Sequence, residues 1–492
     1  MLVHHYSSAL ELAGAAGLDT VALSERARVV LREAGDRAFA LSAYTTAQGF
    51  YERAVELWPR DDPDRPQLLF SYGRVLNWVE QSGVDVLTEA RDGLLAAGDL
   101  GTGAEAEMLI GETVWLQGLR DQTFEHVRAA AALVEDEPSS YSKAYVVANV
   151  SRFLALAGEH QEAIRLGREA LAMAEELELD ELRAHALNNI GISRLAIGDR
   201  GGLDDVEQSL AIAVAFSSVE SVRAYGNLAS MLEDLGELER AFAMVAEGRR
   251  LGERFGLGEA RLWLRAEAVR PLYFGGEWDA AARQYDELIA EFEEDSYWME
   301  APCRWVRGRV RLARGDTRGA QEDADRALDL ARVAKDPQIL WPSLAFAARA
   351  FNTTDTRRAD ALAAELLSDW RALGWQKAGE SDWLADIGFV LPLLGREEEL
   401  LEGAAQTQNH TPWFEAAVAC ASGDFRGAAD VYAGMGALPE EAYARLRAAE
   451  AFVHEGRRAE ANAELQAALA FWRSVGATAY VREGEALLAA SA

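Results

Sequence analysis

Apolar and small residues recur every three or four positions along most of the chain, with polar residues between them. Ala163, Gly167 and Ala170 form one such series, and Ala320, Ala324 and Ala327 form another. Because residues at this spacing share one face of an α-helix, the pattern predicts amphipathic helices whose small residues let neighbouring helices approach closely. Long β-branched runs bounded by turns, which are typical of strands, are absent from the sequence.

A short turn motif separates these predicted helices at nearly constant spacing. It consists of a glycine, an acidic residue and, about five positions later, an alanine, and it begins at Gly158, Gly198, Gly236, Gly276 and Gly315. The intervals are 40, 38, 40 and 39 residues. Glycine readily adopts the left-handed conformation that ends a helix, so each motif predicts the tight turn of a helical hairpin. The sequence therefore predicts an all-α solenoid of stacked hairpins with a period of about 39 residues.

Weaker copies of the turn extend the array in both directions. Upstream, Gly118 lies 40 residues before Gly158, and downstream the degenerate copies are Thr354-Asp355, Gly395, Gly423 and Gly456. We therefore divide the chain into three expected regions: N-terminal hairpins over 1–104, regular repeats over 105–335 and degenerate repeats over 336–492. About eleven or twelve hairpins are expected in total.

Composition narrows the possible partners. The 492 residues carry a formal net charge of -32, which would repel the phosphates of nucleic acids and anionic lipids. The first residues, MLVHHYSSALELAGAAG, have no basic region ahead of an apolar stretch, so we expect no signal peptide. No uninterrupted apolar stretch in the sequence is long enough to span a membrane. Its two cysteines, Cys303 and Cys420, are too far apart to suggest a disulfide framework and are expected to be buried. We expect a cytoplasmic protein that binds neither nucleic acid nor membrane.

No motif for catalysis or for metal binding is found in the sequence. HExxH, GxSxG and the phosphate loop GxxxxGK[ST] are all missing, and the only histidine pair, His4 and His5, is adjacent in sequence and so points to different helical faces. We therefore expect no enzymatic activity, no metal and no cofactor.

The turn motif resembles that of the tetratricopeptide superfamily. Ala47, Tyr51, Ala54 and Pro59 match the second half of one tetratricopeptide unit. The segments SERARVVLREAGDRAFALSAYTTAQGFYERAVELWPRDDPDRPQLLFSYGRVL and ALAFWRSVGATAYVREGEALLA resemble the C-terminal repeat region of actinobacterial-type signalling proteins. In that family a nucleotide cyclase or a LuxR-type DNA-binding regulator is joined to a signalling ATPase. The resemblance implies a right-handed superhelix whose first helices line a concave groove, and it suggests a cyclase or ATPase module as a partner.

Candidate groove residues recur at fixed distances before the turn glycines, which places them at equivalent helix positions. Nine residues before the glycine stand Asn149, Asn189 and Asn227; thirteen before it stand Tyr145, His185, Arg223 and Trp263; six before it stand Arg152, Arg270 and Arg309; and Trp305 stands ten before Gly315. Amide, basic and aromatic groups together suit recognition of an extended or acidic peptide. A purely structural role is the alternative, in which the asparagines link adjacent hairpins and the arginines pair with carboxylates.

These observations predict a protein-interaction scaffold that holds a peptide or partner segment in its groove. The alternative, which rests on the family resemblance, is the sensor or regulatory portion of a signalling ATPase, nucleotide cyclase or transcription regulator.

Overall fold

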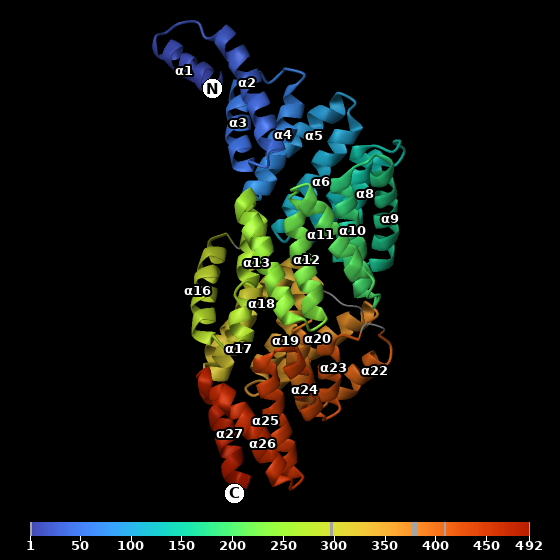
Figure 1. Cartoon of the computed structure of the whole chain (residues 1–492), viewed down its shortest axis with the longest axis vertical. Helices are drawn as coiled ribbons and strands as arrows, with labels where there is room; N and C mark the ends of the chain where they lie inside the picture. The colour runs from blue at the N-terminus through green and yellow to red at the C-terminus, as the bar shows by residue number, and fades with distance from the viewer. Residues whose placement is uncertain (1, 296–298, 376–380, 408–409, 492) are drawn as a thin grey trace.

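The chain folds into an elongated superhelical solenoid of α-helices, with its two ends at opposite ends of the long axis (Figure 1). The computed structural model describes residues 2–295, 299–375, 381–407 and 410–491. Every regular element within these ranges is helical. The all-helical repeat fold predicted from the sequence is therefore confirmed.

Twelve helical hairpins lie within the described residues, preceded by α1 (Leu2–Ala15) and followed by α27 (Thr478–Ser491). The first and second helices of the hairpins are, in chain order, α2 (Val21–Ala40) with α3 (Tyr44–Leu57), α4 (Arg65–Glu80) with α5 (Val84–Ala96), α6 (Leu100–Leu116) with α7 (Arg120–Val134), α8 (Tyr141–Leu156) with α9 (His160–Glu176), α10 (Asp180–Ala196) with α11 (Gly202–Ala215), α12 (Glu220–Asp234) with α13 (Leu238–Phe255), α14 (Gly258–Glu267) and α15 (Arg270–Phe274) with α16 (Trp278–Asp295), α17 (Glu300–Arg314) with α18 (Thr317–Ala334), α19 (Pro337–Phe351) with α20 (Thr356–Ala372), α21 (Trp383–Leu394) with α22 (Glu397–Ala404), α23 (Pro412–Ala421) with α24 (Phe425–Met435), and α25 (Leu438–His454) with α26 (Arg458–Ser474).

The predicted turns lie where the sequence places them. Each of the five motif glycines, and Gly118 as well, has a φ between 76° and 90°, which is the left-handed conformation that terminates a helix. At the degenerate turn, Asp355 accepts a hydrogen bond from the Arg358 N–H at 3.0 Å and so caps α20. One first helix is interrupted instead of continuous, because Pro271 has no N–H to donate and separates α14 from α15.

Small residues fill the contacts within each hairpin, as the helical pattern predicted. Ala163 and Ala170 in α9, and Ala320, Ala324 and Ala327 in α18, are all buried. The two cysteines are also buried and free. Trp341, Trp383 and Trp472 are core residues, whereas Trp115 is only half-buried and lines a cavity. Most of these tryptophans therefore stabilise hairpin packing.

Hairpins far apart in sequence also touch, because the superhelix winds tightly. The indole of Trp413 donates a hydrogen bond to the Glu233 carbonyl at 2.8 Å, and the Tyr273 hydroxyl donates to Glu440 at 3.0 Å. Lys335 forms an ion pair with Asp121. These partners are separated by 180, 167 and 214 residues, and each contact joins hairpins that are five apart in chain order. Successive turns of the superhelix are therefore in contact at these points.

Replacing Gly236 by alanine tests this contact between superhelical turns. An added Cβ would lie 2.7 Å from Met435 Cγ and 3.2 Å from Pro412 Cγ, in addition to the strain of a φ of 77°. Gly423→Ala is the matched control, because its φ is 79° but nothing lies within 4 Å of the added atom. We expect the control to cost about 1 kcal/mol from backbone strain and Gly236→Ala about 1–3 kcal/mol more from overpacking. Urea unfolding measures both, and equal losses would contradict the contact.

None of the described helices is both long enough and apolar enough to cross a lipid bilayer.

Candidate binding cavity

The first helices of successive hairpins form much of the wall of a cavity of about 800 Å³. Its lining runs from Phe39 at the end of α2 to Ile339 at the start of α19, and side chains from α4, α6, α8, α10, α12, α14 and α17 contribute to it. These are all first helices, which the tetratricopeptide resemblance places on the inner surface. The cavity is therefore the interior counterpart of the expected concave groove.

The structure brings nine of the eleven candidate residues together around this cavity. They are Tyr145, Asn149, Arg152, His185, Arg223, Asn227, Trp263, Arg270 and Trp305. Asn189 and Arg309 are not among the lining residues and are buried instead. Equal offsets from the turn glycines thus select helix positions on one inner surface, although two of the side chains turn into the packing between helices.

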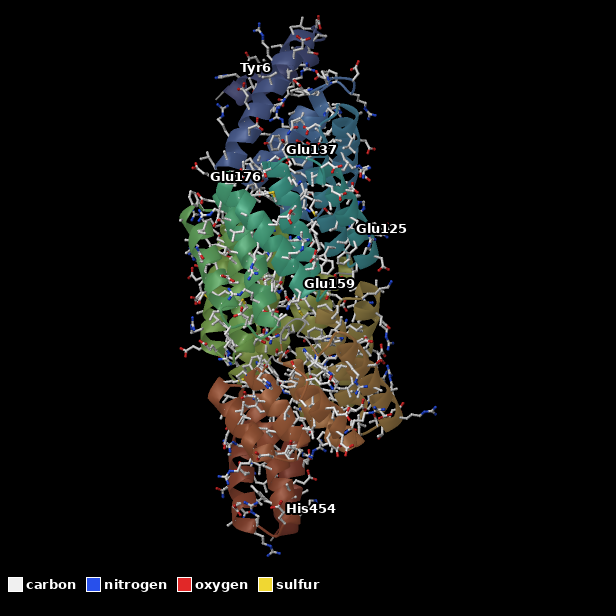
Figure 2. The ribbon with its side chains drawn as sticks, turned by 90° about the vertical axis from the view of Figure 1, so that its right-hand side faces the viewer. Tyr6, Glu125, Glu137, Glu159, Glu176 and His454 are labelled. Carbon is white, nitrogen blue, oxygen red and sulfur yellow. The ribbon has the colours of Figure 1, made fainter. Side chains whose placement is uncertain are left out.

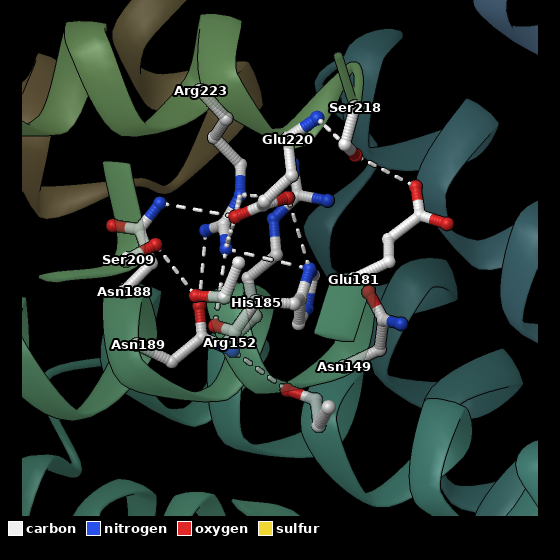
Figure 3. Close-up of polar contacts among 12 residues, drawn as sticks. Asn149, Arg152, Glu181, His185, Asn188, Asn189, Ser209, Ser218, Glu220 and Arg223 are labelled. Atoms are coloured by element: carbon white, nitrogen blue, oxygen red, sulfur yellow. Dashed lines mark hydrogen bonds and ion pairs between the residues drawn. The ribbon is translucent and has the colours of Figure 1, made fainter. Parts of the chain in front are cut away.

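Arg223 is the centre of the polar network on this surface (Figure 3). Its Nε donates to Glu220 Oε1 at 2.9 Å and its Nη1 donates to Asn189 Oδ1 at 2.9 Å. Asn188 Nδ2 donates to the same Glu220 oxygen at 3.1 Å. Burial disfavours the charged form of Glu220, but Arg223 and then His185 outweigh it and hold the pKa of this carboxyl well below its ordinary value. Glu220 and Arg223 therefore form an ionised pair at neutral pH.

His185 lines the cavity and is held by the same polar network. Its Nδ1 lies 3.2 Å from Glu220 Oε2 and 3.4 Å from Arg223 Nη2, while its Nε2 is buried and has no hydrogen-bond partner in the part of the chain that the structure describes. Burial, and then the charge of Arg223, lower the pKa of this imidazole, so His185 is neutral near pH 7.

The asparagine series combines both roles considered from the sequence. Asn189 Nδ2 donates to the Ala148 carbonyl of the preceding hairpin at 2.8 Å, and Asn227 Nδ2 donates to Asn188 Oδ1 at 2.9 Å. These two asparagines link adjacent hairpins. Asn149 Nδ2 instead donates to the Tyr145 carbonyl of its own helix at 2.9 Å. Asn149 and Asn227 still line the cavity, whereas Asn189 serves packing.

The remaining candidates are held by neighbours at the edge of the cavity. Arg152 pairs with Glu112 at 2.5 Å, and Arg270 contacts Glu233 and lies 3.5 Å from Glu267. The Trp305 indole donates to Ser343 Oγ at 2.9 Å, so its polar group is already occupied.

Arg309 belongs to a buried ion network outside the cavity. It pairs with Asp382 at 2.7 Å and with Asp386, both from the hairpin of α21. Asp386 also pairs with Arg349 at 2.6 Å. The network holds α17, α19 and α21 together.

The cavity is acidic, contrary to the basic groove expected from the sequence. Its lining carboxylates outnumber its arginines by eight to four. The carboxylates are Glu105, Glu112, Glu178, Asp180, Glu181, Glu220, Glu267 and Asp336, and the arginines are Arg74, Arg152, Arg223 and Arg270. The basic residues of the later repeats are paired with carboxylates of their own or neighbouring helices, and the hairpin that turns at Gly118 adds Glu105 and Glu112.

Sequence reasoning missed the lining of the earlier hairpins, although the same offsets identify it. Positions thirteen, nine and six before Gly118 are Glu105, Leu109 and Glu112, and the same positions before Gly83 are Phe70, Arg74 and Asn77. All six side chains line the cavity, and Gly83 has a φ of 99° like the later turn glycines. The equivalence was hard to see in the sequence because the residue types at these offsets differ between the early and the later hairpins.

Comparisons with known proteins bear on the fold. The crystal structure of a Rap protein complexed with Competence and Sporulation Factor matches this chain with a TM-score of 0.53 at 17% identity, over 72% of this chain and 100% of the Rap chain. The chain has a tetratricopeptide-like repeat fold.

A signal transduction ATPase with a tetratricopeptide repeat sensor, from Pyrococcus horikoshii, also matches this fold. Its TM-score is 0.40 at 13% identity, over 66% of this chain and 53% of that one, which is too weak to support a conclusion. No protein-family model matches the sequence, and no curated protein matches it either.

Among the described residues, no group of three or more His, Cys, Asp or Glu side chains is placed to hold a metal ion.

Proposed function

We propose that this tetratricopeptide-like protein is an interaction scaffold that binds a short extended peptide, or an extended segment of a partner protein, inside the cavity. The observation that carries the proposal is the cavity of about 800 Å³, much of whose lining comes from equivalent positions of successive first helices. This size lies within the range of specific ligand pockets.

The polar groups of the wall suit a peptide backbone. The Asn227 side chain lines the cavity, and its amide oxygen can accept a hydrogen bond from a peptide N–H. Aromatic side chains such as Tyr145 and Trp263 offer apolar surface for side chains of the ligand. The Rap structure with the same kind of fold contains Competence and Sporulation Factor, which is compatible with ligand binding as a use of this fold.

Filling the cavity tests this function. Ser230 of α12 lines the cavity and is only half-buried, so Ser230→Trp would occupy ligand space without displacing a core side chain. The purified wild-type protein and this variant are incubated with a random hexapeptide library, and retained peptides are quantified by mass spectrometry. We expect at least a tenfold loss of retention in the variant.

Ser474→Trp is the matched control, because Ser474 is exposed near the end of α26 and does not line the cavity. We expect its retention to equal that of the wild type. Equal retention by Ser230→Trp, with an unchanged helical circular-dichroism spectrum, would overturn the assignment of the cavity.

A regulatory role is the second candidate function. The segments quoted above resemble the repeat region of signalling proteins that carry a cyclase or an ATPase, and we propose such a module as the partner that responds to the bound peptide. A pull-down of a cyclase or ATPase module by the purified chain, measured with and without bound peptide, tests the role. Capture that is independent of peptide would contradict it.

A further inference from the structure

One carboxylate of the cavity wall is buried without a counter-charge. Glu105 of α6 is only 8% exposed. Its Oε1 accepts a hydrogen bond from Ser142 Oγ at 2.5 Å, and no basic group lies within ion-pair distance in the residues that the structure describes. Burial raises the pKa of Glu105, with the Ser142 hydrogen bond acting in the opposite direction. A buried carboxylate without a cation destabilises the fold, so its presence in a cavity needs a reason.

The surroundings of Glu105 are acidic and aromatic. Glu181 lines the same cavity. Burial, and then the carboxylates of Glu105 and Glu181, raise the pKa of the Tyr141 phenol to about 12. The Glu181 carboxylate accepts a hydrogen bond from Ser218 Oγ at 2.9 Å. Tyr141 stacks on Tyr145, with ring centroids 6.3 Å apart. The Glu105 carboxylate thus lies beside these stacked tyrosines, because its hydrogen-bond partner Ser142 directly follows Tyr141.

Arg74 of the cavity lining does not neutralise Glu105. The Arg74 guanidinium lies over the Phe39 ring at 4.1 Å and 5.9 Å from the Trp78 ring, and no ion pair to it is found among the described residues. It acts on Glu105 only at longer range. Glu105 therefore has no counter-ion at contact distance, and the position of Arg74 over Phe39 shows that aromatic rings of this cavity lining can accept a stacked cation.

We propose that the Glu105 end of the cavity binds a cationic group of the ligand, an ammonium or a guanidinium. The Glu105 carboxylate supplies the ionic hydrogen bond, Glu181 adds negative charge, and the rings of Tyr141 and Tyr145 supply aromatic contact surface. The group comes either from a Lys or Arg side chain or from the N-terminal amine of a peptide. This inference rests on the proposed peptide-binding function and defines which peptides the cavity selects.

Four pools of synthetic hexapeptides distinguish these sources. The first has free N-termini and lacks Lys and Arg, the second is N-acetylated and contains them, the third is N-acetylated and lacks them, and the fourth is the third with a fixed Glu. Retention by the purified full chain is measured by mass spectrometry. We expect the first or the second pool to be retained at least tenfold better than the third, and the fourth to be retained least.

Glu105→Gln keeps the shape and the acceptor for Ser142 but removes the charge. We expect it to reduce the preference for cationic pools to under threefold and, because the buried charge is gone, to raise the melting temperature at pH 7 by a few degrees. If Glu105 had only a structural role, its replacement would not lower the cationic preference while raising the melting temperature. Glu125→Gln, at an exposed position of α7 on the edge of the molecule (Figure 2), should leave both quantities unchanged.

Two results would overturn the inference and are distinct from failure of the proposed function. The first is equal retention of the third pool by the wild type, and the second is a cationic preference that survives in Glu105→Gln. Either result leaves peptide binding intact. Retention of no pool would overturn the inference together with peptide binding itself.

Discussion

Replacing Asp386 by alanine is expected to destabilise the folded protein by about 3–5 kcal/mol, since it leaves buried positive charge uncompensated. Asp386 is 1% exposed and lies between two arginines, with Arg309 Nε at 2.9 Å and Arg349 Nη1 at 2.6 Å. Arg309 keeps Asp382 in the variant, but Arg349 loses its carboxylate and is left against the Tyr443 ring. Urea unfolding followed by circular dichroism measures the loss.

The control for this prediction is an ion pair at the surface. Asp360 pairs with Arg396 at 2.5 Å, but its side chain is 45% exposed. Solvent screens such a pair, so Asp360→Ala should cost less than about 1 kcal/mol. Similar small losses for both variants would mean that the buried network does not hold the hairpins of α17, α19 and α21 together.

Glu440 is expected to make the protein less stable as the pH rises from about 4.5 to 8. This residue is buried where two superhelical turns meet, and burial raises its pKa to about 7, against the opposing effect of Arg309. The folded state therefore holds a proton that the unfolded state, with an ordinary carboxyl pKa of 4.5, has already released. Stability falls where the folded state binds more protons, and the full difference is about 3 kcal/mol.

Glu440→Gln isolates this contribution, because the amide does not titrate and its oxygen can still accept from Tyr273. Unfolding free energies of the wild type and the variant are measured from pH 4.5 to pH 8. We expect the variant to gain about 3 kcal/mol relative to the wild type across this range. Glu125→Gln, an exposed exchange of the same kind, should follow the wild type, and parallel curves for Glu440→Gln would contradict the prediction.

The hairpins were predictable because their signals are local. A turn glycine must adopt a positive φ, and a small residue five positions later must face the preceding helix. Both requirements restrict the residue type within a short window of sequence, where they can be recognised. The positions before Gly158, Gly198 and Gly236 were placed on the inner surface for the same reason. An offset from a turn fixes the angle of a side chain around its helix.

Contacts between distant hairpins could not be recognised from such local patterns. Arg309 was expected in the groove, but its partners Asp382 and Asp386 come from a hairpin 73 and 77 residues later. The acidity of the cavity was missed because Glu105 belongs to a hairpin whose turn at Gly118 matches the motif only weakly. Winding of the superhelix decides which helices meet, and a pattern with a period of one hairpin does not encode it.

Site-specific photo-cross-linking tests the central claim, that the cavity lined by the first helices is where the protein binds a peptide. A photoreactive benzoyl-phenylalanine is placed at Tyr145, which lines the cavity, or at Tyr6 in α1, which lies at the N-terminal end of the molecule (Figure 2). Each protein is irradiated with the hexapeptides that the wild type retains, and adducts are quantified by mass spectrometry. We predict adducts at position 145 at least tenfold above those at position 6. Equal yields at the two positions, or adducts at position 6 alone, would contradict the account.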